Sequence, residues 1–361
     1  SQNYKLHQHQ NTLIGNYFMN NNLINEALKS KVANVPIWFL RQAGRHIPEY
    51  YNIREKEKNF IDFCLNEDLV IKCTKLPLKY YDLDAAIVFS DILMIPWAMK
   101  RNVKFCKNYG PSLDPMIPGE TKILQNISII NELTPLKNSI MCLRKELPSS
   151  ICLIGFAGAP WTLACYMIEG RGSKDFINTR KALWSSRKWF MKLIDTLIVY
   201  ISQKLEMQAN AGANVLMLFD TWSHMIPNNF FKDCAITPVS KIVKILRSKK
   251  IYTPIIGLPF KAGPSIIDYS YESLVDCIAL DWSMELKWAT KNINNEIAIQ
   301  GNLDPASLIS NDSNNLEQNV ISILDTMKER KFIFNVGHGL TPECKIENVK
   351  KFINIVRNYQ R

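Results

Sequence analysis

Two arginines that follow a short apolar run are the first residues of this chain that could do chemistry. The run Ile37–Leu40 ends at Arg41, and the small-residue turn Gln42-Ala43-Gly44 leads on to Arg45. A guanidinium group is planar and permanently charged, and its donors match the geometry of a carboxylate or a phosphate. The pattern therefore predicts an anion clamp on a rigid turn, and solvated surface arginines are the alternative.

Three further residues could act on a bound anion. Asp91 follows the apolar run Ala85–Phe89, and its carboxylate could accept several N–H donors or simply cap the next helix. Tyr166 lies near a helix start, where a phenol either donates to an anion or is satisfied in the core. His338 lies between two glycines, which allow close backbone approach and favour a functional role.

Short apolar runs that alternate with helical patterns must position these residues. The eight runs are Ile37–Leu40, Ala85–Phe89, Ile151–Phe156, Asn214–Phe219, Pro254–Leu258, Cys277–Leu280, Ile297–Gln300 and Phe332–Phe334. The stretches with helical periodicity are Asn22–Lys31, Phe63–Tyr80, Thr121–Lys145, Lys174–Ala211, Pro238–Ser248, Met284–Asn292, Asn315–Arg330 and Glu343–Asn358. Repeated strand–helix units predict an α/β fold with parallel strands, and eight units predict a closed (β/α)₈ barrel of the TIM type.

The barrel would bring the candidate residues together, because active sites of such barrels lie at the carboxyl ends of the strands. The weakest unit is the fifth, where Pro254 opens the run and the following helix is short. Residues 1–21 are polar and rich in Gln and Asn, and we expect an N-terminal extension there. Residues 22–361 then form the barrel as one domain.

Composition excludes several classes of function. The 361 residues carry a formal net charge of +11, but the lysines are scattered rather than set in an aromatic-interleaved stripe. This argues against nucleic acid. A lysine- and asparagine-heavy composition explains the charge without a ligand, and attraction of a polyanionic ligand is the sharper explanation. No apolar run is long enough to span a membrane, so we expect a soluble protein. The nine cysteines form no Cys-x-x-Cys pair, and neither a zinc-type ligand cluster nor a nucleotide-binding fingerprint stands out.

Two longer motifs resemble the signatures of a known family, uroporphyrinogen decarboxylase of haem and chlorophyll biosynthesis. They are PIWFLRQAGRHIPEY at Pro36–Tyr50 and GFAGAPWTLACYMIEG at Gly155–Gly170. The shorter motifs Phe89–Leu93, Gln300–Pro305 and Asn335–Leu340 follow in the family's order. The resemblance extends from about Asn22 to the C-terminus, and it implies a barrel that forms a homodimer and needs neither metal nor organic cofactor.

The resemblance also implies the site. By position, the residues that match the family's substrate-binding and catalytic positions are Arg41, Ala43, Arg45, Arg54, Asp91, Tyr166, Thr221 and His338. Arg41, Asp91, Tyr166 and His338 are the catalytic candidates among them, and Ala43 would act through its backbone. Two departures are mild: His46 stands where the family usually has tyrosine, and Thr221 where some members have serine.

The implied substrate is a cyclic tetrapyrrole with eight carboxylates and four inward N–H groups. Arginine forks suit its rim, and one carboxylate, Asp91, suits its centre. A protonated pyrrole can be its own electron sink, so each acetate can lose CO₂ without a cofactor while Asp91 stabilises the ring's positive charge. The proton donor stays open between Tyr166, His338 and an ordered water.

Two other functions remain open from the sequence. Relatives on the same barrel transfer methyl groups from corrinoids to thiols with zinc, but His338 has no Cys two residues away. A tetrapyrrole carrier that binds without turnover is the second. The compartment is open as well, between the cytoplasm and a plastid-type organelle.

Overall fold

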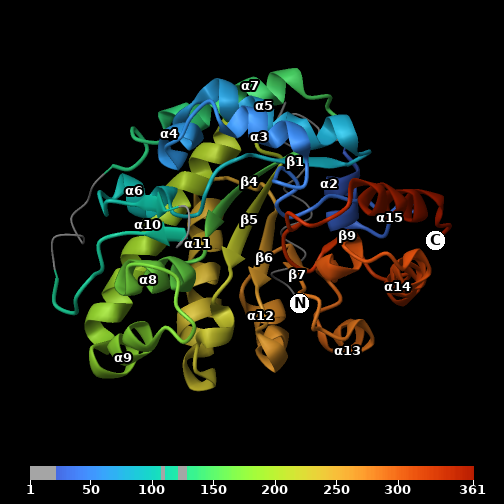
Figure 1. The fold of residues 1–361 in the computed structure, drawn as a ribbon. Helices are drawn as coiled ribbons and strands as arrows, with labels where there is room; N and C mark the ends of the chain where they lie inside the picture. Colours follow the sequence, from blue (N-terminus) through green and yellow to red (C-terminus); the bar gives the residue numbers. More distant parts are fainter. Residues whose placement is uncertain (1–21, 107–109, 121–127) are drawn as a thin grey trace.

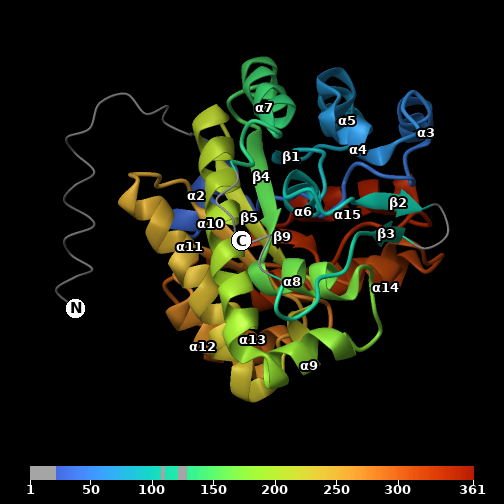
Figure 2. The same ribbon diagram turned by 90° about the vertical axis from the view of Figure 1, so that its left-hand side faces the viewer.

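The computed structural model describes residues 22–106, 110–120 and 128–361. Seven parallel strands form one curled sheet in the order β1-β4-β5-β6-β7-β8-β9, with helices packed around it (Figures 1 and 2). These strands are β1 Ala85–Ile87, β4 Cys152–Gly158, β5 Val215–Asp220, β6 Ile255–Pro259, β7 Cys277–Ala279, β8 Ala298–Leu303 and β9 Phe332–Val336. A separate antiparallel pair joins β2 Lys104–Cys106 to β3 Gly110–Ser112.

The helices follow the strands in βα alternation. In chain order the α-helices are α2 Leu23–Lys29, α3 Pro48–Arg54, α4 Phe60–Leu65, α5 Glu67–Tyr80, α6 Met94–Ala98, α7 Thr134–Glu146, α8 Pro160–Glu169, α9 Ile177–Ser185, α10 Arg187–Ala211, α11 Thr237–Ser248, α12 Ile266–Glu272, α13 Leu286–Asn292, α14 Ser313–Thr326 and α15 Ile346–Asn358. Short turns of helix are η3 Ser223–Met225, η4 Asn228–Phe230, η5 Lys232–Ile236, η6 Gly263–Ser265 and η7 Pro305–Leu308. This order confirms the predicted α/β barrel architecture.

Two of the predicted helices are each divided in two. The stretch Phe63–Tyr80 is split at Asn66, whose side-chain oxygen accepts from the N–H of Leu69 at 3.1 Å and so caps the start of α5. Asparagine is a strong N-cap, and an N-cap begins a new helix. The stretch Lys174–Ala211 is split at Ser186, between α9 and α10.

The prediction of a regular strand over Ile37–Leu40 is wrong in extent. Only Ile37 forms a bridge, with Phe334 of β9, while Asp84 N–H donates to the Ile37 carbonyl at 2.9 Å. Side chains take the place of a full ladder: Asp84 accepts from Ile37 N–H, and Asn335 accepts from Leu40 N–H. We call this short segment, residues 36–40, the seam, because it connects β9 to the start of β1 and completes the circuit of strands.

Alternating side chains on the strands divide the apolar core into two layers. On β5, Val215 and Met217 belong to the inner cluster within the barrel, while Leu216 and Leu218 pack under the helices. Helix α2 adds Ile24 to the inner cluster, next to residues that begin the strands. The amino ends of the strands are therefore covered by apolar side chains, and the carboxyl ends are left for polar ones.

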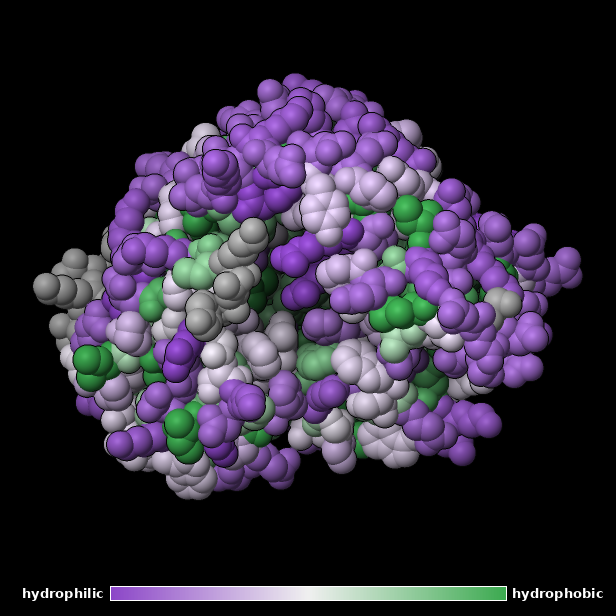
Figure 3. Space-filling model, in the orientation of Figure 1, coloured by the Kyte–Doolittle hydropathy of each residue, from purple (hydrophilic) through white to green (hydrophobic). Residues whose placement is uncertain are grey.

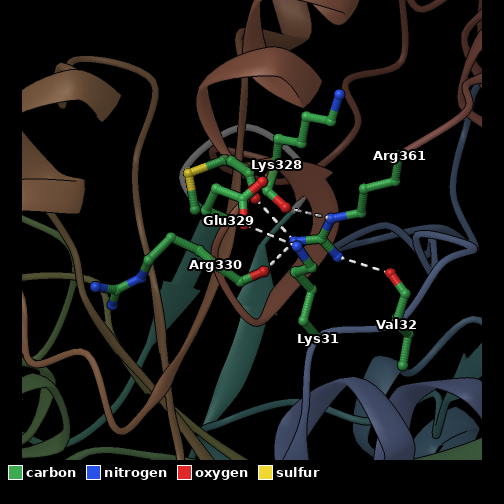
Figure 4. A network of polar contacts seen from close by, with 7 residues as sticks. Lys31, Val32, Lys328, Glu329, Arg330 and Arg361 are labelled. Atoms are coloured by element: carbon green, nitrogen blue, oxygen red, sulfur yellow. Dashed lines mark hydrogen bonds and ion pairs between the residues drawn. The ribbon is translucent and has the colours of Figure 1, made fainter.

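The last residue of the chain ties the amino end of the barrel together. The guanidinium of Arg361 donates to the carbonyls of Val32 at 3.0 Å, Met327 at 2.8 Å and Lys328 at 2.9 Å (Figure 4). Lys31 pairs with Glu329 at 2.8 Å in the same network. The loop after α2 and the end of α14 are thus joined through one side chain.

Some predictions lie outside this description. The polar extension 1–21 and the first residues of the predicted helix Thr121–Lys145 fall outside the described residues. The division into an extension and one barrel domain therefore stays a prediction. Over the ranges that are described, no helix is both long enough and apolar enough to cross a membrane.

Candidate functional site

The turn that carries Arg41 is fixed on both sides. The side chain of Gln42 is buried, accepting from Phe39 N–H at 3.2 Å and donating to the carbonyl of Ala85 at 3.0 Å. The N–H of Leu340 donates to the carbonyl of Leu40 at 3.0 Å. Arg41 itself is exposed and has a left-handed backbone with φ 53°. For a residue other than glycine this conformation persists only where neighbouring contacts impose it, and it is enriched at functional sites.

A glycine beside His338 makes room for the Arg41 side chain. A Cβ added to Gly339 would come within 2.7 Å of Arg41 Cγ, closer than real side chains approach. A Cβ at Gly337 would likewise meet the backbone of Asp281 at 2.9 Å. Both glycines are therefore required for close packing, as their positions in the sequence predicted.

Asp91 lies at the carboxyl end of the first sheet strand and is half-buried. One carboxylate oxygen accepts from the N–H of Leu93 at 2.8 Å, and the other has no hydrogen-bond partner among the described residues. Burial raises the pKa of Asp91, whereas the Leu93 N–H and the charges of Lys204 and Arg41 lower it. Asp91 is not the N-cap of the next helix, because α6 begins after Leu93 and has no side-chain cap. The contact with the Leu93 N–H leaves one oxygen available to a ligand.

Tyr166 projects from α8 toward the same group of charges. The pKa of its phenol is raised to about 12, mainly by burial; Asp91 acts in the same direction, and Trp222 and Arg41 act in the opposite one. The ring lies 6.1 Å from that of Trp222, which follows β5. Tyr166 therefore keeps its proton at neutral pH and can act as a hydrogen-bond donor.

His338 stands in an aromatic cluster with Phe260 and Trp282. Its ring centre is 5.0 Å from Phe260 and 6.0 Å from Trp282. Burial, then the positive charges of Arg41 and Lys261, lower the pKa of His338 to about 4. The imidazole is therefore neutral at pH 7 and works as a hydrogen-bonding group rather than a cation.

Lys261 adds a cation beside this cluster. It too has a left-handed backbone, with φ 55°, and its N–H donates to the buried Asp281 carboxylate at 3.1 Å. Its ammonium lies 4.9 Å from the Trp282 ring, and the side chain is exposed. Lys261 follows the end of β6, so it lies at the carboxyl ends of the strands beside the aromatic cluster.

The remaining predicted residues are less tightly gathered. Ala43 is partly buried and Arg45 is exposed on the turn after Arg41, and Thr221 is partly buried one residue past β5. Arg54 stands apart: its guanidinium donates to the carbonyl of Lys58 at 3.2 Å and lies over the Phe60 ring at 5.3 Å. The structure brings Arg41, Asp91, Tyr166 and His338 together, and Arg54 is largely committed to its own loop.

A second carboxylate at a strand end, that of Asp220, lies on the outer side of the sheet, toward the helices. Asp220 ends β5, is 1% exposed and accepts from the Thr162 hydroxyl at 2.6 Å. Its other oxygen has no partner among the described residues, and burial raises its pKa to about 7. It lies among Thr162 of α8 and Tyr269 of α12, so it belongs to the layer between strand and helices.

One charged residue near Asp91 was missed from the sequence. Lys204 of α10 is completely buried, and its ammonium has no hydrogen-bond partner among the described residues. This lysine was not singled out from the sequence, yet helical spacing offered a signal. It lies four residues before Gln208 and three after Ile201, both of which face the core.

The molecular surface is hollowed in this part of the molecule. Figure 3 shows a depression near the centre of the face, over β4 and β5, with strongly hydrophilic residues beside it and apolar ones within it. Among the described residues no group of three or more His, Cys, Asp or Glu is placed to hold a metal ion. The described residues thus provide cations, one carboxylate, a phenol and a neutral imidazole.

These groups could act on a ligand that is anionic at its rim and positively charged or rich in N–H groups at its centre. Arg41 and Lys261 present positive charge to anions, and Asp91 presents a carboxylate oxygen to donors or to a developing cation. The class of protein defined in this way is a (β/α) barrel with a candidate anion-binding site at the strand ends.

Comparison with known proteins identifies the family. The family model described as Uroporphyrinogen decarboxylase (URO-D) matches residues 19–359. A Rickettsia africae protein named uroporphyrinogen decarboxylase is 40% identical over 335 residues, which cover 92% of this chain and 96% of the relative. One of the same name from Rhodospirillum rubrum is 39% identical, covering 89% of this chain and 92% of the relative. The chain belongs to the uroporphyrinogen decarboxylase family.

Solved structures support the fold. A methyltransferase from Methanosarcina mazei superposes with a TM-score of 0.75 at 15% identity, covering 91% of this chain and 96% of that one. A putative vitamin-B12-independent methionine synthase from Listeria monocytogenes gives 0.54 at 13% identity, covering 91% and 98%. At these identities the likeness concerns the barrel alone.

Proposed function

We propose that this chain is a uroporphyrinogen decarboxylase, a cofactor-independent carboxy-lyase that converts the four acetate side chains of uroporphyrinogen III to methyl groups. The product is coproporphyrinogen III, an intermediate of haem and porphyrin biosynthesis. The observation that carries the proposal is the site itself: one half-exposed carboxylate, Asp91, has a free oxygen and lies close to Arg41 and Tyr166. The identity of the substrate is inferred from the family to which the chain belongs.

Asp91 is assigned to the centre of the substrate. Its free oxygen can accept hydrogen bonds from inward-facing pyrrole N–H groups, as a carboxylate has room for several donors. When the ring carbon next to the one that bears an acetate takes up a proton, the pyrrole becomes positively charged. The ionised Asp91 stabilises that charge at close range, which lowers the barrier for the step.

The chemistry balances within the substrate. A proton adds to the ring carbon next to the one that bears the acetate, and the bond between the acetate methylene and its carboxylate breaks to release CO₂. The electron pair of that bond neutralises the ring cation and leaves an exocyclic methylene. A second proton converts the methylene to methyl while the ring proton is lost, so one net proton is consumed for each CO₂ released.

Arg41 and Arg45 are assigned to the rim carboxylates, and Ala43 offers its backbone on the same turn. Lys261 offers a further cation beside His338. Thr221 and the neutral His338 supply hydrogen bonds. Arg54 is also assigned to the rim carboxylates, although its guanidinium already donates to local carbonyls.

The pKa values of the candidate groups reduce the choice of proton donor. His338 has a pKa of about 4, so almost none of it is imidazolium at pH 7. Tyr166 keeps its proton, because its pKa is raised to about 12. We therefore assign proton delivery to Tyr166 or to a water bound beside it, with His338 as an orienting group.

Turnover of uroporphyrinogen is the direct test. Purified protein is incubated anaerobically with uroporphyrinogen III, and the products are oxidised and separated by chromatography. Stepwise loss of four carboxylates to coproporphyrinogen is expected. Tight binding without any loss of CO₂ would instead identify a carrier, and stoichiometric zinc with methyl transfer from a corrinoid would identify a methyltransferase.

Assembly and location are further parts of the proposal. We assign a homodimer on the strength of the family resemblance, to be tested by light scattering coupled to size exclusion. A mass of one 41.6 kDa chain at micromolar concentration would refute it. The cytoplasm and a plastid-type organelle are the two compartments considered, and imaging of the tagged full-length protein separates them.

A further inference from the structure

A buried cation stands behind the site. Lys204 on α10 is completely buried, and its Nζ has no hydrogen-bond partner among the described residues. Burying an ammonium group is costly unless another charge or a polarisable group compensates it. Its Nζ lies 5.3 Å from the centre of the Phe156 ring on β4. A ring face alone stabilises a buried charge only modestly. A nearby anion is therefore needed to compensate the ammonium.

The position of Lys204 along the barrel wall follows from its neighbour Gln208. The amide of Gln208 accepts from Phe156 N–H and donates to the Phe156 carbonyl, both at 2.9 Å, so it pins α10 to β4. Lys204 precedes Gln208 by one helical turn on the same face. In this parallel sheet α10 leads back to the start of β5, so an earlier turn lies nearer the carboxyl ends of the strands. Lys204 therefore lies level with the end of β4.

Asp91 reaches the same place from the other side. The last ladder bond between the chain after β1 and β4 runs from Val88 N–H to the Ile154 carbonyl, at 3.0 Å. Beyond it, a Cβ on Gly158 would meet Ile92 at 3.1 Å, so the residues around Asp91 lie against the last residue of β4. The carboxylate and the ammonium influence one another's pKa in the expected sense, each favouring the charged form of the other.

No other described charge competes for Lys204. Besides Asp91, the titratable group that acts on it is Cys64 of α4, and burial raises the pKa of this thiol far above neutrality. Arg54 and Cys73 act on Cys64 one layer further out, and Cys73 is likewise neutral, with its pKa raised to about 12. At neutral pH Asp91 is thus the anion that Lys204 faces.

We propose that Lys204 is a positioning residue for catalysis: its buried ammonium keeps Asp91 ionised while the substrate is bound. Arg41, the other cation acting on Asp91, is exposed and is assigned to a substrate carboxylate, which offsets its charge. Lys204 cannot be reached by that carboxylate, since its side chain is completely buried. The positive charge behind Asp91 therefore persists throughout the reaction. This inference rests on the role proposed above for Asp91.

The test measures Asp91 directly and needs no turnover. The carboxyl carbon of Asp91 is followed by nuclear magnetic resonance in protein with ¹³C-labelled aspartate, and Asp91→Asn assigns the signal. Replacing the buried ammonium with an apolar chain of similar length in Lys204→Met should raise the pKa of Asp91 by about one unit, the low end for loss of a nearby opposite charge. Lys192→Met removes an exposed lysine from the same helix and should leave the Asp91 pKa unchanged.

The wild-type protein supplies a second measurement that needs no folded variant. Burial lowers the pKa of Lys204 to about 8, against the opposing effect of Asp91. The Asp91 signal should therefore show a second, smaller step near pH 8 as the lysine loses its proton. That step should be absent in Lys204→Met. It should also be absent in Lys204→Arg, because a guanidinium keeps its proton far above pH 8, but the Asp91 pKa should there stay close to the wild-type value.

An Asp91 pKa that is the same in wild type and Lys204→Met, with no step near pH 8 in the wild type, would overturn the inference. The acid limb of the kcat/KM profile should move to higher pH with the Asp91 pKa in Lys204→Met. A uniform fall in rate at all pH values would mark a structural role instead and also contradict it. Full activity of Asp91→Ala would refute the role of Asp91, and the resonance measurement distinguishes that failure from failure of the present inference.

Discussion

Asp91 and Asp220 are both aspartates at the carboxyl end of a buried strand, yet their environments differ in kind. Asp91 is half-buried, has one oxygen on the Leu93 N–H and the other available, and its pKa is lowered by the charges of Lys204 and Arg41, against the effect of burial. Asp220 is 1% exposed, shares a hydrogen bond with Thr162 and has its pKa raised to about 7. Residue type and strand end were therefore not enough to define a functional acid. The side of the sheet to which each side chain points determines whether the carboxylate is ionised and available to a ligand or buried in the packing between strand and helices.

Removing the Asp91 carboxylate should have the largest effect on activity. Asp91→Asn keeps an oxygen for the Leu93 N–H but loses the charge, and we expect the rate to fall by about 10²- to 10³-fold, as when one charge-stabilising group is deleted. Asp91→Ala should lose the same activity and about 1 kcal/mol of stability, because the hydrogen bond to the Leu93 N–H is lost. Steady-state kinetics with uroporphyrinogen and urea unfolding measure the two quantities.

Asp91→Glu extends that test, because one methylene moves the acceptor relative to the pyrrole N–H groups. It should also be impaired. Near-wild-type turnover by Asp91→Ala would contradict the assigned mechanism and remove the contrast with Asp220.

Arg41→Lys should have the next largest effect. A point charge cannot reproduce a two-pronged guanidinium contact, and a loss of about tenfold or more in kcat/KM is expected, with both affinity and rate affected. Lys261→Ala serves as the comparison and should be milder, since its ammonium is exposed beside Trp282. Negligible effects in both variants would mean that the substrate carboxylates are held elsewhere.

His338→Gln should reduce activity several-fold without altering the acid limb of the pH profile. The reason is that the pKa of His338 is lowered to about 4, so the imidazole is already neutral across the working range. The measurement is kcat against pH from 5 to 9 in both proteins. Loss of a step near pH 6.5 in the variant would show that His338 titrates in that range, contrary to this expectation.

Asp220→Asn should leave activity within about twofold and change stability instead, because Asn can still accept from Thr162. In the folded state the pKa of Asp220 is raised from 3.8 to about 7, so the folded state holds this proton more tightly than the unfolded state does. Its contribution to the unfolding free energy is present below about pH 4 and is lost as pH rises to about 7. The loss is on the order of a few kcal/mol.

The measurement is urea unfolding of both proteins at pH 5 and pH 8. Since Asn has no proton to lose, Asp220→Asn should gain stability relative to wild type as the pH rises. An unchanged difference between the two pH values would show that Asp220 is ionised in the folded protein, as Asp91 is proposed to be.

The sequence predicted the barrel and the gathering of Arg41, Asp91, Tyr166 and His338, because strand ends in a parallel sheet share one edge. It did not predict that the seam would use side chains as acceptors, since Asp84 and Asn335 become neighbours of residues 36–40 only in the closed sheet. Lys204 was missed because the apolar spacing of α10 was not weighed against the habit of lysine to face water.

The contacts that each arginine makes could not be predicted from the sequence either. Arg41 and Arg54 are the same residue type on the same short stretch, yet Arg41 lies against Gly339 and Arg54 over Phe60. Which carbonyls and rings compete for a guanidinium depends on the tertiary structure. Spacing along the chain does not reveal it.

The seam has a consequence for the order in which the protein is made. Ile37 is held by Phe334 of β9, so the segment that leads to Arg41 has no sheet partner on that side until the ribosome has added nearly three hundred more residues. Pairing of such distant segments is slow, since the intervening chain must first be brought together. The arginines of the anion clamp are thus synthesised early, but they reach their final position late in folding. A chain that stops before β9 would lose His338 and also the positioning of the arginines near its own beginning.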